Sequence, residues 1–147
     1  MSLYVTRHGQ TNYNVNDLVC GISPAALTTD GIEQAKELGR QLKSIKYDFL
    51  YVSPLQRAID TADYANVEGL EVIIEPRISE SFIELCKRVY EFLDEIKEQA
   101  TKSNVLLVCH GAVCRAINTY FNEMSNDDIF YYQTENCQLL KYDYLSR

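Results

Sequence analysis

Basic residues are in short supply in this chain of 147 residues. Fourteen lysines and arginines stand against twenty-one aspartates and glutamates, so the formal net charge is −7. A protein with this balance has no broad cationic surface that could neutralise a nucleic-acid backbone or an anionic membrane. We therefore expect no nucleic-acid partner and no membrane partner. Any anionic ligand must be held by a local cluster of basic groups.

Long hydrophobic runs are also missing. The longest ones, such as residues 105–109, are far below the roughly 20 residues that span a bilayer, and no basic-then-apolar leader precedes the first strand-like segment. We expect a soluble, cytoplasmic protein. With 46% hydrophobic and 24% charged residues, the chain has the size and balance of a single globular domain over residues 1–147.

Cysteine and histidine are too few and too scattered for a disulfide framework or a zinc centre. There are only two histidines and five cysteines, with no C-x-x-C pair. The cysteines are Cys20, Cys86, Cys109, Cys114 and Cys137. Since they are odd in number and mostly inside apolar segments, we interpret them as buried thiols of a reducing compartment. We expect no metal site and no cofactor.

Short apolar strands alternate with helical stretches along the chain. Strands are predicted at residues 3–6, 48–53, 71–75 and 104–109, and the Tyr-rich tail at 130–144 is also strand-like. Helices are predicted at 28–45, at 55–66, from Ser81 onward, and at 112–121; Ser81 and Glu84 form an S-x-x-E capping box. This order predicts an α/β three-layer sandwich, in which a mostly parallel central sheet is flanked by helices and ligands bind at the carboxyl ends of strands.

Each of the two histidines directly follows an apolar strand and precedes a glycine. His8 lies in the tripeptide RHG at residues 7–9, and His110 lies in CHG at residues 109–111. Glycine at a strand end lets the backbone turn sharply and lets a ligand approach, and the helix that follows offers free N–H groups to an anion. We expect the two imidazoles to face one pocket, although a lone histidine is more often a hydrogen-bonded core residue.

Two arginines stand beside these strand ends. Arg7 precedes His8, and Arg57 follows the end of the second predicted strand. A guanidinium donates up to five N–H bonds in a planar fork and stays charged, which suits the oxygens of a phosphoryl group. Surface ion pairing explains most arginines, but a solvated charge has no evident reason to follow the apolar strand before Arg7.

Several sequence blocks resemble the histidine phosphatase superfamily, in its phosphoglycerate mutase-like branch. They are LYVTRHGQTNYN at 3–14, LTxxGxxQA at 27–35, SPLxRAxxTA at 53–62, PRISE at 76–80, VLLVCHGAVCR at 105–115 and the pair Asn136-Cys137. The blocks cover nearly the whole chain in the order of the family. The resemblance implies the phosphoglycerate mutase-like fold and metal-independent hydrolysis of a phosphomonoester.

The resemblance also implies a role for individual residues. His8 would attack phosphorus and be transiently phosphorylated. Arg7, Arg57 and His110 would surround the equatorial oxygens, with Asn14 and the Gly111 N–H as supplements. Positive charge placed where negative charge spreads is the main requirement of phosphoryl transfer, so this set needs no metal. His8 must attack as neutral imidazole, with its second nitrogen donating to a fixed carbonyl.

A general acid must protonate the leaving oxygen and then activate water. The family's R-x-x-E block maps to Glu80, and we favour Glu80 over Glu84 because the predicted capping box already explains Glu84. The chain lacks the insertion that family members usually carry after this block. It therefore resembles the compact branches, and the implied substrate is a phosphorylated small molecule or a phosphoprotein. The oligomeric state is not predicted.

Three alternatives stay open at this point. The first is phosphoryl transfer of the phosphoglycerate mutase type. The second is a cysteine-dependent phosphatase, because Cys109 and Arg115 satisfy C-x5-R, although the Asp-Pro acid of such enzymes is missing. The third is a non-catalytic module that keeps the phosphate pocket without turnover.

Overall fold

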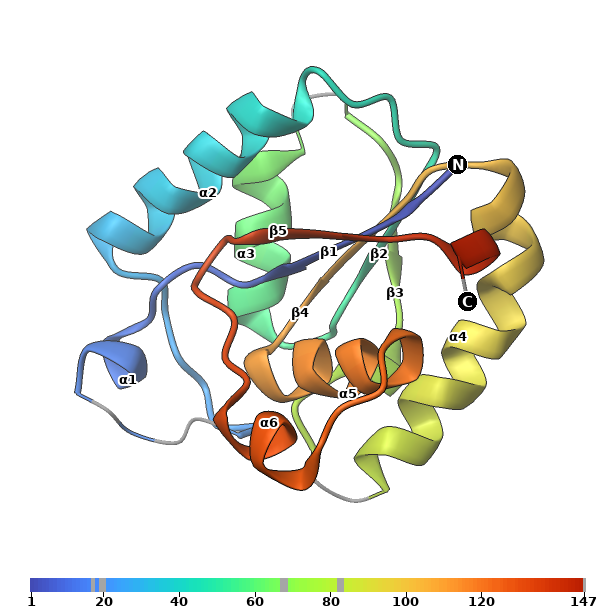
Figure 1. Cartoon of the computed structure of the whole chain (residues 1–147). Coiled ribbons are helices and arrows are strands. Elements are labelled where there is room, and N and C mark those ends of the chain that lie inside the picture. Colours follow the sequence, from blue (N-terminus) through green and yellow to red (C-terminus); the bar gives the residue numbers. More distant parts are fainter. Residues whose placement is uncertain (17, 19–20, 67–68, 82–83, 147) are drawn as a thin grey trace.

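The computed structural model of the chain describes residues 1–16, 18, 21–66, 69–81 and 84–146. Within these ranges one five-stranded sheet runs through the molecule in the order β3-β2-β4-β1-β5 (Figure 1). The strands are β1 (Leu3–Arg7), β2 (Phe49–Val52), β3 (Val72–Ile74), β4 (Val105–Cys109) and β5 (Leu139–Tyr142). Only β5 is antiparallel, along the outer side of β1, and the other pairings are parallel. The mostly parallel sheet that the sequence predicts is confirmed.

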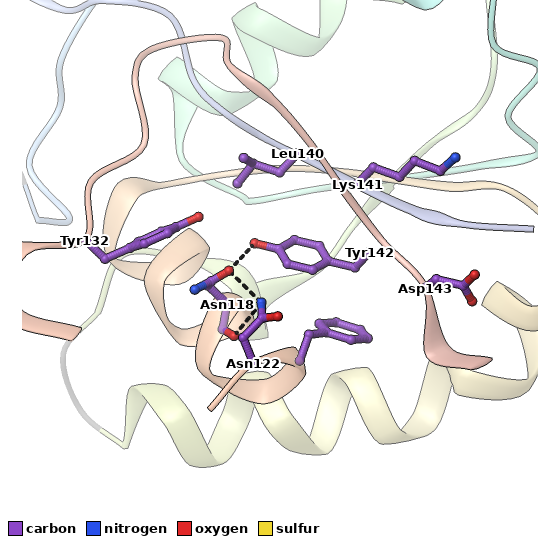
Figure 2. A pocket seen from close by; sticks show the side chains of 8 residues that line it. Asn118, Asn122, Tyr132, Leu140, Lys141, Tyr142 and Asp143 are labelled. Atoms are coloured by element: carbon purple, nitrogen blue, oxygen red, sulfur yellow. Dashed lines mark hydrogen bonds between the residues drawn. The ribbon is translucent and has the colours of Figure 1, made fainter. Parts of the chain in front are cut away.

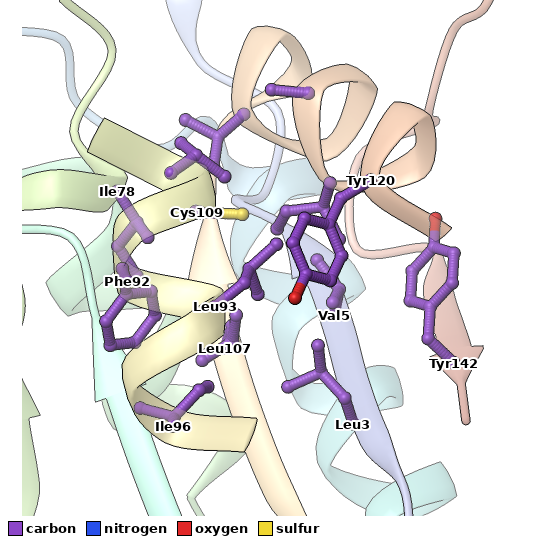
Figure 3. Close-up of a cluster of buried hydrophobic side chains, with 14 of the residues drawn as sticks. Leu3, Val5, Ile78, Phe92, Leu93, Ile96, Leu107, Cys109, Tyr120 and Tyr142 are labelled. Carbon is purple, nitrogen blue, oxygen red and sulfur yellow. The ribbon is translucent and has the colours of Figure 1, made fainter. Parts of the chain in front are cut away.

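Helices cover both faces of this sheet (Figure 1). They are α1 (Asn12–Val15), α2 (Thr29–Leu42), α3 (Gln56–Ala65), α4 (Leu85–Lys102), α5 (Gly111–Phe121) and α6 (Asn126–Tyr131), with short 3-10 turns at Pro76–Ile78 and Tyr144–Ser146. Side chains from α4 and α5 form a core with one face of the sheet, which Figure 3 shows, and side chains from α2 and α3 form a second core with the other face. The three-layer sandwich is thereby confirmed.

The central strand β4 shows why the sheet needs helices on both sides. Its five residues are all buried. Val105, Leu107 and Cys109 lie in the core under α4 and α5, whereas Leu106 and Val108 lie in the core under α2 and α3. Alternate residues of a strand point to opposite faces, so a continuously apolar strand is stable only when both faces are covered.

The loop after β1 is pressed against the beginning of α2. Thr28 caps α2 by accepting a hydrogen bond from the Gly31 N–H, and a Cβ added to Gly31 would lie only 2.1 Å from the Gln10 carbonyl oxygen. No other residue type than glycine leaves room for this approach. The contact fixes the course of the chain directly after His8.

The prediction for the start of the third long helix was wrong. The helix α4 begins at Leu85, and Glu84 before it has a left-handed backbone with φ of 48° and makes no side-chain cap. A left-handed residue cannot continue a right-handed helix, so Ser81 stays outside α4 and the proposed capping box does not form. Residues 82–83 lie outside the described residues.

The C-terminal tail is strand only in part. The helix α6 at residues 126–131 takes in the first two residues of the predicted strand-like tail, and Ser125 caps it by accepting from the Asp128 N–H. Two acidic residues in the first turn also stabilise this helix through its dipole.

The cysteines differ in their exposure to solvent. Cys109, Cys114 and Cys137 are buried, Cys86 is exposed, and Cys20 lies outside the described residues.

None of the helices in the described ranges is both long enough and apolar enough to cross a membrane.

Candidate active site

His8 and His110 lie side by side at the carboxyl ends of the neighbouring parallel strands β1 and β4. Their ring centroids are 5.2 Å apart. The backbone N–H of His8 donates to the backbone carbonyl of Cys109 at 2.9 Å. Both side chains are almost fully withdrawn from solvent, with 2% and 0% exposure. The parallel register of the two strands thus brings together two histidines that are about a hundred residues apart in the sequence.

The His8 ring is held as a neutral imidazole with one free lone pair. Its Nδ1 lies 2.7 Å from the Gly9 carbonyl oxygen. Because a carbonyl only accepts, Nδ1 carries the proton and Nε2 is unprotonated. Burial lowers the pKa of His8 from 6.5 to about 3, with smaller contributions in the same direction from Arg57 and Arg7, whereas the Gly9 carbonyl opposes them. The ring therefore has the state that a nucleophile needs.

Two polar side chains that the sequence analysis gave no role fix the backbone around His8. The Gly9 N–H donates to Thr61 Oγ1 at 2.9 Å, and the Thr61 hydroxyl donates to the Arg57 carbonyl at 2.7 Å. On the other side, Asn136 Nδ2 donates to the His8 carbonyl at 2.9 Å. Thr61 follows Arg57 by four residues, which is about one helical turn, and this spacing is the sequence signal that could have indicated its role.

His110 makes one hydrogen bond and leaves its other ring nitrogen open. Its Nε2 lies 2.6 Å from Ser53 Oγ, and Nδ1 has no hydrogen-bond partner among the residues that the structure describes. Burial lowers the pKa of His110 well below 6.5, and His8 and the two arginines act in the same direction. Ser53 Oγ also accepts from the Leu55 N–H at 3.3 Å, so its own proton can go to Nε2. In that arrangement Nδ1 carries the ring proton and can donate it to an anion.

Arg57 and Glu80 form a partly buried ion pair next to the histidines. Arg57 is 1% exposed, and its Nη2 donates to Glu80 Oε2 at 2.7 Å. The same guanidinium donates to the carbonyls of Gly21 at 2.5 Å and Ser23 at 3.2 Å. Glu80 Oε2 is 3.8 Å from His110 Nδ1. Arg57 and Glu80 are 23 positions apart in the sequence, and their contact places the Glu80 carboxylate next to Arg57 and His110.

Glu84, the competitor for the role of general acid, lies elsewhere. Its side chain is 65% exposed and pairs with Lys87 at 3.8 Å on the surface. Arg88 in the first turn of α4 donates to the carbonyls of Ser79 and Ser81, and so holds the segment that carries Glu80. The structure thus separates the two glutamates, with Glu80 in the cluster and Glu84 outside it.

Arg7 and Gly111, which adjoin the two histidines in the sequence, lie close to each other. Arg7 Nη1 donates to the Thr134 carbonyl at 2.8 Å, whereas its Nε is buried with no partner in the described part of the chain. A Cβ added to Gly111 would be 3.4 Å from Arg7 Nε. Gly111 is the first residue of α5, and the side chain of His110 before it does not cap that helix. Backbone N–H groups at such a helix start can receive an anion.

Asn14 serves a structural purpose in this structure. Its Oδ1 accepts from the Thr11 N–H at 3.0 Å and its own N–H donates to Thr11 Oγ1 at 3.3 Å, and these two bonds form the capping box of the short helix α1. The Thr11 hydroxyl also donates to Asn14 Oδ1 at 3.1 Å. The amide of Asn136 lies 3.4 Å from the same oxygen. The Asn14 side chain therefore belongs to the network around the His8 carbonyl, and its oxygen is already engaged.

Unsatisfied nitrogens concentrate in this cluster. Among the described residues, buried side-chain atoms without a hydrogen-bond partner are Arg7 Nε, Arg57 Nε, His110 Nδ1 and Thr134 Oγ1. Leaving a buried donor unpaired costs about 1–3 kcal/mol, so such groups normally have a partner. Two guanidiniums and an imidazole thus have unused nitrogens, an arrangement that suits an anionic ligand.

Cys109 and Arg115 are not arranged for cysteine chemistry. The Cys109 side chain lies within the apolar core under α4 and α5 (Figure 3), with Sγ 3.7 Å from Cys114 Sγ. Burial raises the pKa of the Cys109 thiol well above its usual value, which disfavours the nucleophilic thiolate. Arg115 uses Nε and Nη2 on the Tyr132 carbonyl, at 3.1 Å and 2.9 Å. The C-x5-R alternative therefore finds no support in the structure.

A separate pocket of about 490 Å³ lies between the end of α5 and β5 (Figure 2). Asn118, Phe121, Tyr132 and Tyr142 are among its lining residues, and Tyr142 donates to Asn118 Oδ1 at 3.1 Å. None of the site residues that the sequence predicts lines it.

The model of the histidine phosphatase superfamily (branch 1) matches residues 3–82 and 76–147. The chain belongs to this superfamily. It is 28% identical over 153 residues to "Uncharacterized phosphatase PhoE" of Bacillus subtilis (strain 168), which covers 84% of this chain and 77% of the relative. It is 39% identical over 83 residues to the adenosylcobalamin/alpha-ribazole phosphatase of Escherichia coli (strain K12), which covers 56% of this chain and 41% of the relative.

Solved structures agree with the fold. The phosphoserine phosphatase of Entamoeba histolytica in complex with 3-phosphoglyceric acid superimposes with a TM-score of 0.87 over 99% of this chain and 91% of that chain, at 23% sequence identity. The predicted family and fold are confirmed, and so is the enzyme class, a phosphatase of this superfamily.

Proposed function

We propose that this phosphatase hydrolyses phosphomonoesters through a phosphohistidine on His8, while Arg7, Arg57 and His110 hold the phosphoryl group. The observation that carries the proposal is the state of His8. Its Nδ1 donates to a backbone carbonyl at 2.7 Å, its Nε2 has no hydrogen bond with the described residues, and its low pKa keeps it neutral beside the guanidiniums of Arg57 and Arg7. A neutral nucleophile surrounded by fixed positive charge is suited to attack a phosphate ester.

In the first step the His8 Nε2 lone pair forms a bond to phosphorus, and the bond from phosphorus to the ester oxygen breaks. Arg7, Arg57 and His110 Nδ1–H receive the charge on the equatorial oxygens. Glu80 gives its proton to the leaving oxygen.

In the second step Glu80, now a carboxylate, takes a proton from a water molecule whose oxygen attacks phosphorus. The bond between phosphorus and Nε2 breaks, inorganic phosphate leaves, and His8 returns to its neutral state. The contact of Arg57 with Glu80 at 2.7 Å positions the Glu80 carboxyl group at the site. Gly111 at the start of α5 adds a backbone N–H to the phosphoryl site.

The proposed substrate is a phosphorylated small molecule. Names of relatives denote small phosphate esters, such as alpha-ribazole phosphate in Escherichia coli. Ile22, which is 70% exposed, lies between the two residues whose carbonyls hold Arg57, so an apolar side chain stands in the segment next to the phosphoryl site. An ester with an apolar leaving group can bury surface there.

A metal-free hydrolysis panel tests the function. Small alkyl and aryl phosphates, phosphoglycerates and a phosphohistidine protein are incubated with protein in the presence of a chelator, beside the His8→Ala variant. We expect sustained phosphate release from small esters and a phosphoenzyme that is labile to acid, both lost in the variant. Activity that the chelator abolishes and magnesium restores would contradict the proposal. One equivalent of phosphoenzyme without turnover would identify a phosphate-binding module instead.

A further inference from the structure

We propose that His8, Glu80 and His110 also form a binding site for a divalent transition-metal ion of the Zn²⁺ type, and that this ion inhibits hydrolysis. Each of the three side chains offers one ligand atom, and these atoms all lie within 4.8 Å of one another. Two imidazoles and one carboxylate are a ligand set that zinc uses in proteins. The inhibition rests on the proposed function, whereas the binding of the ion does not.

The ring of His8 is already oriented as a metal ligand. Histidines that bind metals almost always donate their other ring N–H to a carbonyl, a carboxylate or a water molecule. The Nδ1–H of His8 donates to the Gly9 carbonyl, which leaves Nε2 as the ligand atom. The Gly9 backbone is itself fixed by Thr61, so the ring cannot easily turn away.

His110 has the same arrangement with the opposite nitrogen. Its Nδ1 is buried without a partner among the described residues, and its Nε2 lies 2.6 Å from Ser53 Oγ. A hydroxyl both donates and accepts. Ser53 can therefore accept the Nε2–H when Nδ1 binds an ion, and can donate to Nε2 when Nδ1–H binds a phosphoryl oxygen. One serine supports both ring states.

The spacing of the cluster needs only a small contraction to hold zinc. Bonds of about 2.0–2.1 Å in a tetrahedron place ligand atoms about 3.4 Å apart. His110 Nδ1 and Glu80 Oε2 are 3.8 Å apart, and the largest separation in the cluster is at most 4.8 Å. Glu80 lies outside the helices and strands, between the 3-10 turn Pro76–Ile78 and α4, so this contraction requires no shift of a strand or a helix.

The nearby arginines oppose the ion and set the character of the site. Arg57 donates to Glu80 at 2.7 Å, and its charge repels a dication. Oε2 of Glu80, which faces His110, is also the oxygen that accepts from Arg57. A carboxylate oxygen has two lone pairs, so Glu80 can keep this bond while it binds an ion. The repulsion makes the site weaker than a dedicated zinc centre. We expect reversible binding that a chelator removes, with higher hydrolysis after chelation.

Bound zinc is expected to inhibit hydrolysis by competing directly with the substrate. It occupies Nε2 of His8, the atom that attacks phosphorus, and it engages the carboxylate of Glu80. Substrate and ion cannot use Nε2 at the same time. Zinc is therefore expected to raise KM for a small aryl phosphate without changing kcat.

The chain is well suited to a direct test, because its only two histidines both lie in this cluster. Metal binding that depends on imidazole therefore reports on this site, provided that the protein carries no histidine tag. Thiols are the competing ligands. The test uses a Cys20→Ser/Cys86→Ser background, because Cys86 is exposed and Cys20 lies outside the described residues.

The experiment titrates metal-free protein with Co²⁺ and follows the visible absorption bands of the ion, and then measures Zn²⁺ binding by calorimetry. We expect one ion per chain. Its affinity should fall at least about 10-fold in His8→Ala and in Glu80→Gln, and about 10-fold in Ser53→Ala, which removes the partner of a ligand. The matched control Glu84→Gln, an exposed carboxylate outside the cluster, should bind as the background does.

The outcomes separate this inference from the proposed function. Equal binding in His8→Ala and the background, or no binding at zinc concentrations that slow hydrolysis, overturns the metal site even if the enzyme is active. Binding that depends on His8 and Glu80 supports the site even if no ester is hydrolysed, a result that would overturn the proposed function instead. Inhibition that substrate does not relieve contradicts the shared use of Nε2.

Discussion

Acidification is expected to destabilise the folded chain through His8 and His110. Both imidazoles are buried and neutral, with the pKa of His8 lowered to about 3 and that of His110 lowered well below 6.5. In the unfolded chain each ring titrates near 6.5. Between pH 6.5 and 3 the unfolded state therefore binds more protons than the folded state. The contribution of the two neutral imidazoles to the free energy of unfolding is therefore complete above pH 6.5 and decreases as the pH falls below 6.5.

The contribution of His8 can be worked out from these values. One additional proton on the unfolded state changes the free energy of unfolding by about 1.4 kcal/mol per pH unit. Lowering the pH from 7.5 to 5 passes through about 1.5 units below the unfolded pKa, so His8 alone removes about 2 kcal/mol. His110 acts in the same direction. A loss of this size is a large part of the roughly 5–15 kcal/mol that stabilises an ordinary domain.

Urea unfolding at several pH values between 7.5 and 5 measures this effect. The chain has no tryptophan and eleven tyrosines, so far-UV circular dichroism and tyrosine fluorescence are the suitable probes. The matched control is His8→Gln, which keeps a polar side chain but does not titrate. The difference in unfolding free energy between pH 7.5 and 5 should be about 2 kcal/mol smaller in this variant.

Two results would refute the reasoning. One is a pH dependence of stability that is the same in His8→Gln and in the original chain. The other comes from NMR, where only two imidazole Cε1–H signals are expected because there are two histidines. A His8 signal that titrates near pH 6.5 in the folded protein shows that the ring is not held neutral by burial.

Three further predictions follow from the site and the fold. The His8→Ala variant should lose both hydrolysis and phosphoenzyme, whereas Cys109→Ser should keep most of both; the reverse pattern would favour the C-x5-R alternative. Glu80→Gln should slow alkyl phosphates by about 10²- to 10⁴-fold and activated aryl phosphates much less, because only a poor leaving group needs a proton. Equal slowing of both substrates, or a selective loss in Glu84→Gln, would move the general acid away from Glu80. Gly31→Ala should lower the free energy of unfolding by about 1–3 kcal/mol, because its Cβ would lie 2.1 Å from a backbone oxygen; an unchanged urea midpoint would contradict this.

Much of the architecture could be predicted because it depends on local pattern. The buried run of β4 and the amphipathic helices after it follow from the periodicity of apolar residues, which is a property of neighbouring positions. The position of His8 and His110 after two such strands followed from the same pattern. Parallel strands place their carboxyl ends at one edge of the sheet, so the meeting of the two rings at 5.2 Å agrees with what the sequence predicts.

Local pattern failed where a distant contact or a single backbone angle decides the structure. The spacing of Ser81 and Glu84 matches a capping box, but the left-handed backbone of Glu84 moves the start of α4 to Leu85. The tyrosines of the tail have a strand-like composition, yet capping by Ser125 makes the first part a helix. The helix at the start of the tail is short, and in such a segment a cap can outweigh composition.

The chemical details of the site come only from the tertiary structure. Sequence alone proposed His8, Glu80 and the arginines, but it does not contain the contact of Arg57 with Glu80 or that of Ser53 with His110. These pairs are 23 and 57 residues apart, and their distances depend on how helices and strands pack. The ring states of the two histidines in turn depend on burial and on those partners. Residue types and their order therefore determine which groups are present, whereas packing of the two cores determines their distances, their charges and their reactivity.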